Sequence, residues 1–137
     1  YCAPFVIDTA RHDEAFLSRI RELVRTSDEE YLKCSREFTQ ENFNVLHVKD
    51  GELHAELVKC CRNDKIMEIY MGLNAHSGMF MGYKSHSPET LLGVIGQHNE
   101  IMNQILFCDV EGLKKALEQH IYSTIQIYRN ARDGMRG

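Results

Sequence analysis

The chain has 137 residues, of which 43% are hydrophobic and 26% are charged, proportions typical of a single globular domain with one core. The formal net charge of −4 excludes the basic surface of a nucleic-acid-binding domain. No apolar run approaches the roughly 20 residues that cross a membrane, so neither nucleic acid nor a membrane is expected as a direct partner of this segment.

Apolar residues three and four positions apart predict helices along the chain, and no stretch alternates with the period of a strand. A short helix is expected from residue 1 to about residue 10. A second segment follows Asp13, and the capping-box spacing of Ser27 and Glu30 predicts that it breaks there into two helices.

Two further helical segments are expected, at about residues 40–62 and 66–83. The clearest helix start comes next, because Ser87 can cap a helix and Pro88 fits its first position. Asp109 then caps the last helix. The chain is therefore predicted to be one all-α domain, residues 1–137, built as an antiparallel bundle of six or seven helices.

The cysteines and the start of the chain indicate the context of this domain. Five cysteines at irregular spacing favour reduced thiols in a cytoplasmic protein over a disulfide framework. The chain begins with Tyr1 and not with a methionine, so we expect a longer protein to which this segment belongs.

A group of histidines carries the chemistry of the sequence. Asp50 and His54 are four residues apart, so they share one helix face. His98 lies 11 residues before Asp109, and His120 lies 11 residues after it. If these two helices form a hairpin, both imidazoles are about 16 Å from the turn and lie at equal height.

One carboxylate and three imidazoles suit a borderline divalent metal, with zinc or nickel favoured and manganese or iron allowed. They leave coordination positions for an outside ligand. His47, on the same face as Asp50, is a weaker candidate ligand, and His76 is a weak candidate for the wall of an effector pocket. The plain alternative is that these histidines are structural.

These residues resemble the ligand-binding (FCD) domain of FadR-type regulators in the GntR superfamily. The resemblance covers nearly the whole chain, and its ordered pattern consists of Asp50, Leu53, His54, Asn63, His98, Asp109 and His120.

The resemblance implies an all-helical domain with a central pocket for a metal and an effector. Asp50, His54, His98 and His120 would hold one divalent metal, and a small carboxylate effector would lie beside or on it. It also implies a winged helix-turn-helix that precedes this chain, binds operator DNA and is absent here, and a homodimer in the cytoplasm.

Four residues depart from the family pattern. Leu53 replaces a phenylalanine, Gln97 an acidic residue, Gln104 an alanine and Cys108 a glycine. These departures affect the shape of the pocket and the identity of the effector more than the metal.

Three functions are weighed on this basis. The first is a binding module, and not an enzyme, that senses a small organic acid and changes operator binding by the missing domain. The alternative is a metal-dependent hydrolase or oxygenase on a helical bundle, although no general base stands out beside the four residues. The third is a helical interaction domain without metal. The effector, the metal, the sign of regulation, the operator and the dimer interface are not determined by the sequence.

Overall fold

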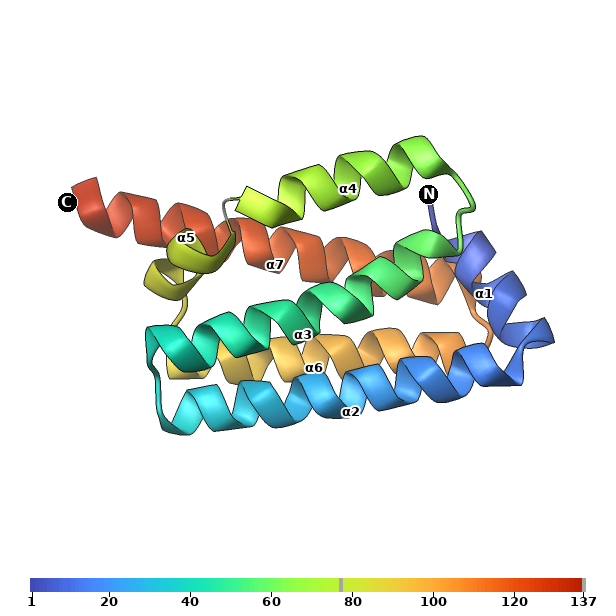
Figure 1. Ribbon diagram of the computed structural model, residues 1–137, viewed down its shortest axis with the longest axis horizontal. Coiled ribbons are helices and arrows are strands. Elements are labelled where there is room, and N and C mark those ends of the chain that lie inside the picture. The colour runs from blue at the N-terminus through green and yellow to red at the C-terminus, as the bar shows by residue number, and fades with distance from the viewer. Residues whose placement is uncertain (77, 137) are drawn as a thin grey trace.

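The computed structural model describes the backbone of residues 1–76 and 78–136 and the side chains of residues 1–72 and 82–134. These residues form seven helices and no strand (Figure 1), which confirms the all-α prediction. The helices are α1 (Ala3–His12), α2 (Glu14–Arg36), α3 (Gln40–Lys59), α4 (Asp64–His76), α5 (Gly78–Ser85), α6 (Pro88–Leu106) and α7 (Val110–Arg136).

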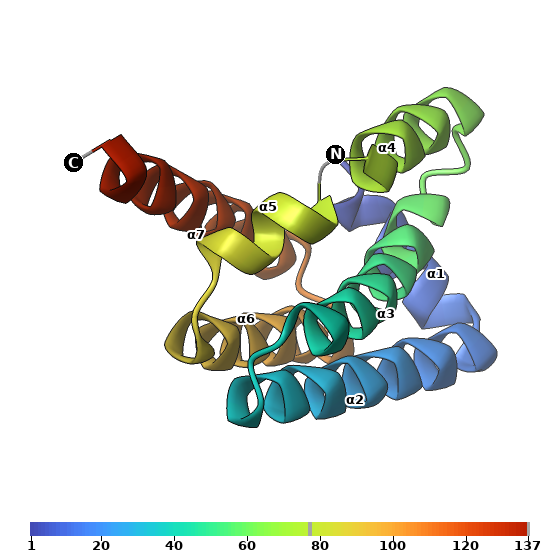
Figure 2. The same cartoon turned by 60° about the vertical axis from the view of Figure 1, so that its left-hand side comes forward.

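The long helices make up the body of the bundle. α2 packs against both α3 and α6, and α7 packs back along α6. α1 closes one end through contacts with α2, α6 and α7, while α5 joins α3 to α7. Figure 2 shows α4 apart from the α2–α6 layer, next to the end of α3. Among the described helices, none has the length and hydropathy that a membrane crossing requires.

The apolar core consists of two clusters. One surrounds α1 and includes Ile7 and Ile20, and it extends along α6 to Ile101. The other contains Tyr31 and also includes Val94 on α6. His98 lies between the two clusters on α6, so a polar side chain occupies the middle of an otherwise apolar helix face.

Side-chain caps fix the helix starts that matter for this arrangement. Ser87 caps α6 and Pro88 lies in its first turn, as predicted, and Thr90 completes a reciprocal capping box. Asp109 accepts a hydrogen bond from the Gly112 backbone N–H at 2.9 Å, so the predicted cap of α7 is confirmed. The α6–α7 hairpin that pairs the histidines is thus set by local sequence.

Two predictions of helix boundaries are wrong. α2 continues through Ser27, whose side chain is 0% exposed. Val24 and Tyr31 are buried on either side of it, so packing of one continuous face outweighs the capping signal. The single segment predicted at 66–83 is instead two helices, α4 and α5.

The prediction that all cysteines are reduced is also wrong. Cys2 and Cys61 form a disulfide, with their Cα atoms 5.6 Å apart. Cys34, Cys60 and Cys108 are free. The paired residues are 59 positions apart in sequence, and the bond ties the start of α1 to the end of α3.

Candidate metal centre

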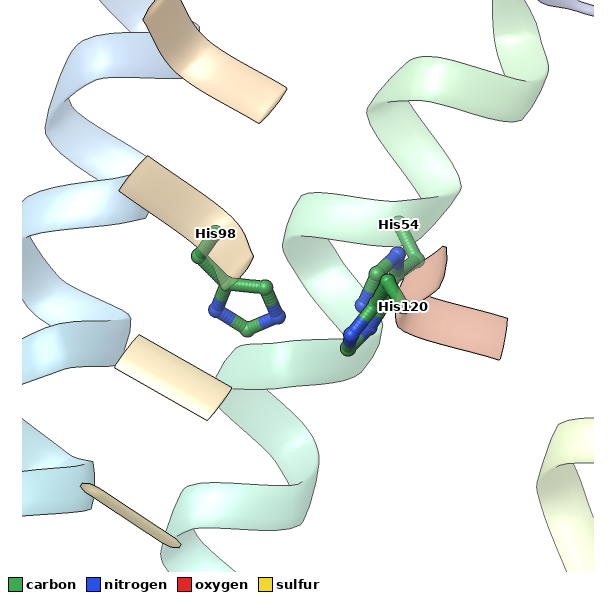
Figure 3. A group of neighbouring side chains, drawn as sticks. All are labelled: His54, His98 and His120. Atoms are coloured by element: carbon green, nitrogen blue, oxygen red, sulfur yellow. The ribbon is translucent and has the colours of Figure 1, made fainter. Parts of the chain in front are cut away.

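Three histidines from three helices converge inside the bundle (Figure 3). His54 comes from α3, His98 from α6 and His120 from α7. One ring nitrogen of each lies within 4.8 Å of those of the other two. The centroids of the His98 and His120 rings are 4.9 Å apart, as expected from their equal distance to the α6–α7 turn.

Asp50 completes the group from one turn before His54. Its Oδ1 lies 3.4 Å from His54 Nε2 and 3.2 Å from His98 Nε2. Tyr31 on α2 donates a hydrogen bond to the same oxygen at 3.0 Å. The structure therefore brings together the four residues named from the sequence and adds a phenol that orients the carboxylate.

The charges of Asp50 and His54 depend on each other. Burial opposes a charge on Asp50, but the charges of His54 and His98 and the close approach of both rings to its carboxylate outweigh burial and hold the pKa of Asp50 well below its usual range. Burial likewise opposes a proton on His54, and the Asp50 carboxylate outweighs it and raises the pKa of His54. Asp50 is thus an anion at neutral pH, ready to balance a cation in the cluster.

His120 is held in a neutral form with one nitrogen engaged. Burial, reinforced by His54 and His98, lowers the pKa of His120 to about 3. Its Nδ1 lies 2.6 Å from Gln97 Oε1, and Gln97 Nε2 donates to Ser123 Oγ at 2.8 Å. With the Gln97 oxygen as acceptor, the His120 Nδ1 carries the hydrogen and Nε2 keeps its lone pair for a metal.

His98 is the most deeply buried member of the cluster. Its side chain is 0% exposed, and within the described part of the chain neither ring nitrogen has a hydrogen-bond partner of good geometry. The 3.2 Å contact between His98 Nε2 and Asp50 is an electrostatic contact and not an aligned hydrogen bond. A buried polar ring of this kind is costly unless something else binds it.

The donor set fits a divalent metal of borderline character. Three imidazoles and one carboxylate are common ligands of zinc, nickel, iron and manganese. Because zinc–nitrogen bonds are about 2.0–2.1 Å long, nitrogens on one ion lie about 3–4 Å apart. The cluster is close to that spacing, and a small contraction would complete it.

A cavity of about 880 Å³ opens on one side of the cluster. Asp50, His54 and His120 line it, whereas His98 lies behind them. The exposed fractions of the Asp50 and His54 side chains, 25% and 20%, reflect this open side. A ligand in the cavity would therefore meet the cluster directly.

The weaker candidates fall outside the cluster. His47 lines the cavity, with its ring centroid 6.3 Å from that of Phe43, and it is not a member of the histidine group. The side chain of His76 lies outside the described residues. His86 also lines the cavity, where its Nδ1 lies 3.0 Å from Thr90 Oγ1.

Sequence reasoning missed the residues that support the cluster. Tyr31 matched the apolar face of its helix, so nothing indicated its bond to Asp50. Gln97 stood out only as a departure from the family pattern. Asn63, part of that pattern, has a structural role, because its Oδ1 accepts hydrogen bonds from the backbone of Lys65 and Ile66 at the start of α4.

In a comparison with protein families, the model of the FCD domain matches residues 8–123. This range contains all seven residues of the sequence pattern. No curated protein and no solved structure matches the chain.

Proposed function

The chain belongs to the FCD domain family, and from that membership and the histidine cluster we propose that it senses an effector for a GntR/FadR-type transcription regulator. Such a domain binds a small molecule and does not transform it, so we propose a binding module and not an enzyme. The setting proposed for it is the cytoplasm.

The proposed ligand is a small organic acid bound next to a divalent metal. Asp50, His54, His98 and His120 would hold the ion, which is zinc or nickel in this proposal. When bound, the ion supplies a positive charge in a partly enclosed site, where an anion gains more from it than in water. The open side of the cluster toward the cavity supports this arrangement.

Effector binding is proposed to act on DNA through the rest of the protein. The cluster joins α3, α6 and α7, so a ligand there favours one arrangement of these helices over another. In a homodimer that carries winged helix-turn-helix domains ahead of this segment, the shift would change the spacing of the two DNA-binding heads. A coupling of about 1–3 kcal/mol is enough to alter operator affinity.

The observation that carries the proposal is the convergence of three ring nitrogens within 4.8 Å beside an ionised carboxylate. Metal analysis of the purified protein, followed by chelation and titration with zinc, tests it. We expect one ion per chain, lost when His98 and His120 are both replaced by alanine. His12→Ala is the control, because that side chain is 74% exposed. A protein that neither contains nor binds stoichiometric metal would refute the proposal.

A further inference from the structure

The walls of the cavity indicate which kind of acid the site accepts, an inference that rests on the proposed function. The cavity volume of about 880 Å³ is near the upper end of the roughly 300–1,000 Å³ of ligand pockets. It can therefore hold a ligand much larger than the carboxylate group that would meet the cluster, and the chemistry of the remaining wall decides what that larger part is.

Fixed positive charge is scarce in this wall. Lys114 is the single lysine or arginine among the described residues that line it, and residues 73–81, whose side chains are not described, contain none in the sequence. The Nζ of Lys114 lies 3.3 Å from Oε1 of Glu111, and 42% of the Lys114 side chain is exposed. It is thus a partly neutralised group near solvent, and no buried cation is available for a second carboxylate.

Most of the wall is apolar. Its described apolar members come from α1, α3, α6 and α7, and they include Val6, Phe43, Leu46, Leu57, Val58, Val94, Leu117, Ile121 and Ile125. Ile121 and Ile125 on α7 are 58% and 43% exposed, and both line this space. Large side chains left open to a cavity gain from contact with an apolar ligand.

Among the described residues of the wall, Glu118 is a second carboxylate besides Asp50, whereas Tyr70, Tyr128 and His86 are neutral. Burial and the nearby Asp50 charge raise the pKa of Tyr70 to about 12 and also raise that of Tyr128. Burial lowers the pKa of His86. Tyr70, Tyr128 and His86 can donate or accept single hydrogen bonds, and Glu118 would repel a second carboxylate.

We propose that the effector is a monocarboxylic acid with a largely apolar body, aliphatic or aromatic, and not a di- or tricarboxylic acid or a sugar acid. The charge of the cluster agrees with this proposal. A divalent ion and the Asp50 carboxylate together have one net positive charge, which a single carboxylate of the effector balances. Gln97 adds no charge to this sum, because it is an uncharged amide where the family pattern has an acid.

Titration calorimetry on the zinc-loaded chain tests the proposal with two matched pairs of probes. Octanoate is compared with octanedioate, which has the same length and a second carboxylate, and hexanoate with gluconate, which has the same number of carbons and five hydroxyls. We expect the apolar member of each pair to bind at least tenfold more tightly. Equal or tighter binding of octanedioate or gluconate would overturn the proposal.

Variants on one wall provide a second test. Ile125→Asn should weaken octanoate binding at least fivefold and leave zinc affinity unchanged. Val45→Asn is the matched control, because Val45 is 45% exposed but lies outside the cavity lining. If Ile125→Asn binds octanoate as the wild type does, the apolar wall is not the recognition element. If the wild-type chain does not bind zinc, that separate result refutes the proposed function itself.

Discussion

Replacing His98 by leucine should make the metal-free protein more stable than the wild type and the zinc-loaded protein less stable than the wild type. His98 is fully buried between two apolar clusters, and its ring nitrogens have no hydrogen bond of good geometry within the described residues. Leucine has a similar volume and no polar atoms, so it suits this position when no metal is present. His98 is therefore expected to lower the free energy of unfolding of the metal-free protein while providing a metal ligand.

The magnitude follows from the two nitrogens. A buried polar group without a partner costs about 1–3 kcal/mol, and the 3.2 Å contact between His98 Nε2 and Asp50 compensates one of the two. Imperfect packing of leucine takes back up to about 1.5 kcal/mol. We expect the metal-free variant to be more stable than the wild type by about 1 kcal/mol, a rise in Tm of roughly 3–5 °C.

Zinc should change the comparison. At a free concentration of about 1,000 times Kd, a ligand that binds only the folded state adds about 4 kcal/mol. The wild type gains this stabilisation, whereas the variant has lost one of its three imidazoles and gains little. With zinc present, the wild type is therefore the more stable protein.

Thermal and urea unfolding, each with chelator and with zinc, measure these differences. His47→Leu is the matched control, since His47 also faces the cavity but is outside the cluster, and it should keep the full response to zinc. The reasoning is refuted if the chelated His98→Leu protein is less stable than the wild type by more than about 1 kcal/mol and zinc still raises its Tm as much.

Four other changes have defined outcomes. Gln97→Leu should lower zinc affinity about 10–100-fold in a competition assay with a chelator, because His120 loses the acceptor that fixes its tautomer, whereas Gln97→Glu keeps an acceptor and should retain binding. Cys108→Gly should raise the free energy of unfolding by about 1 kcal/mol, since Cys108 has φ of 53° at the left-handed position after α6 where glycine is unstrained; Cys108→Ala should not. Reduction of the Cys2–Cys61 disulfide should lower the free energy of unfolding by about 2–4 kcal/mol in urea titrations, and an unchanged midpoint would contradict this. In the metal-free protein, His120 binds a proton below about pH 6.5 in the unfolded chain but only below about pH 3 in the folded chain. The free energy of unfolding should therefore decrease as the pH falls from about 6.5 to about 3, by up to about 1.4 kcal/mol per pH unit. His120→Leu should show a shallower pH dependence, and equal slopes for the two proteins would contradict the lowered pKa of His120.

Local signals accounted for the elements and for part of the site. The helical period and the caps at Ser87 and Asp109 identify α6 and α7, because caps and periodicity depend on residues close in sequence. The equal spacing of His98 and His120 from the turn sets their common height, since the rise of a helix is constant. Asp50 and His54 share a face for the same reason.

Local sequence patterns do not show which helix faces are covered by other helices. The spacing of Ser27 with Glu30 matches a capping box, but α2 runs on because its buried face extends unbroken from Val24 to Tyr31. Ile121 and Ile125 fit the apolar stripe of α7, yet they line the cavity and are not buried in the core. Periodicity gives the direction of a side chain from its own helix and not what lies opposite.

The sequence by itself determined that this protein is helical and which four side chains occupy matching positions on their helices. Only the tertiary structure decided that these positions meet, because the angles at which α3, α6 and α7 cross depend on packing between residues distant in sequence. The same packing gave Asp50 the Tyr31 hydroxyl and His120 the Gln97 amide, and it left one side of the cluster open to an apolar cavity.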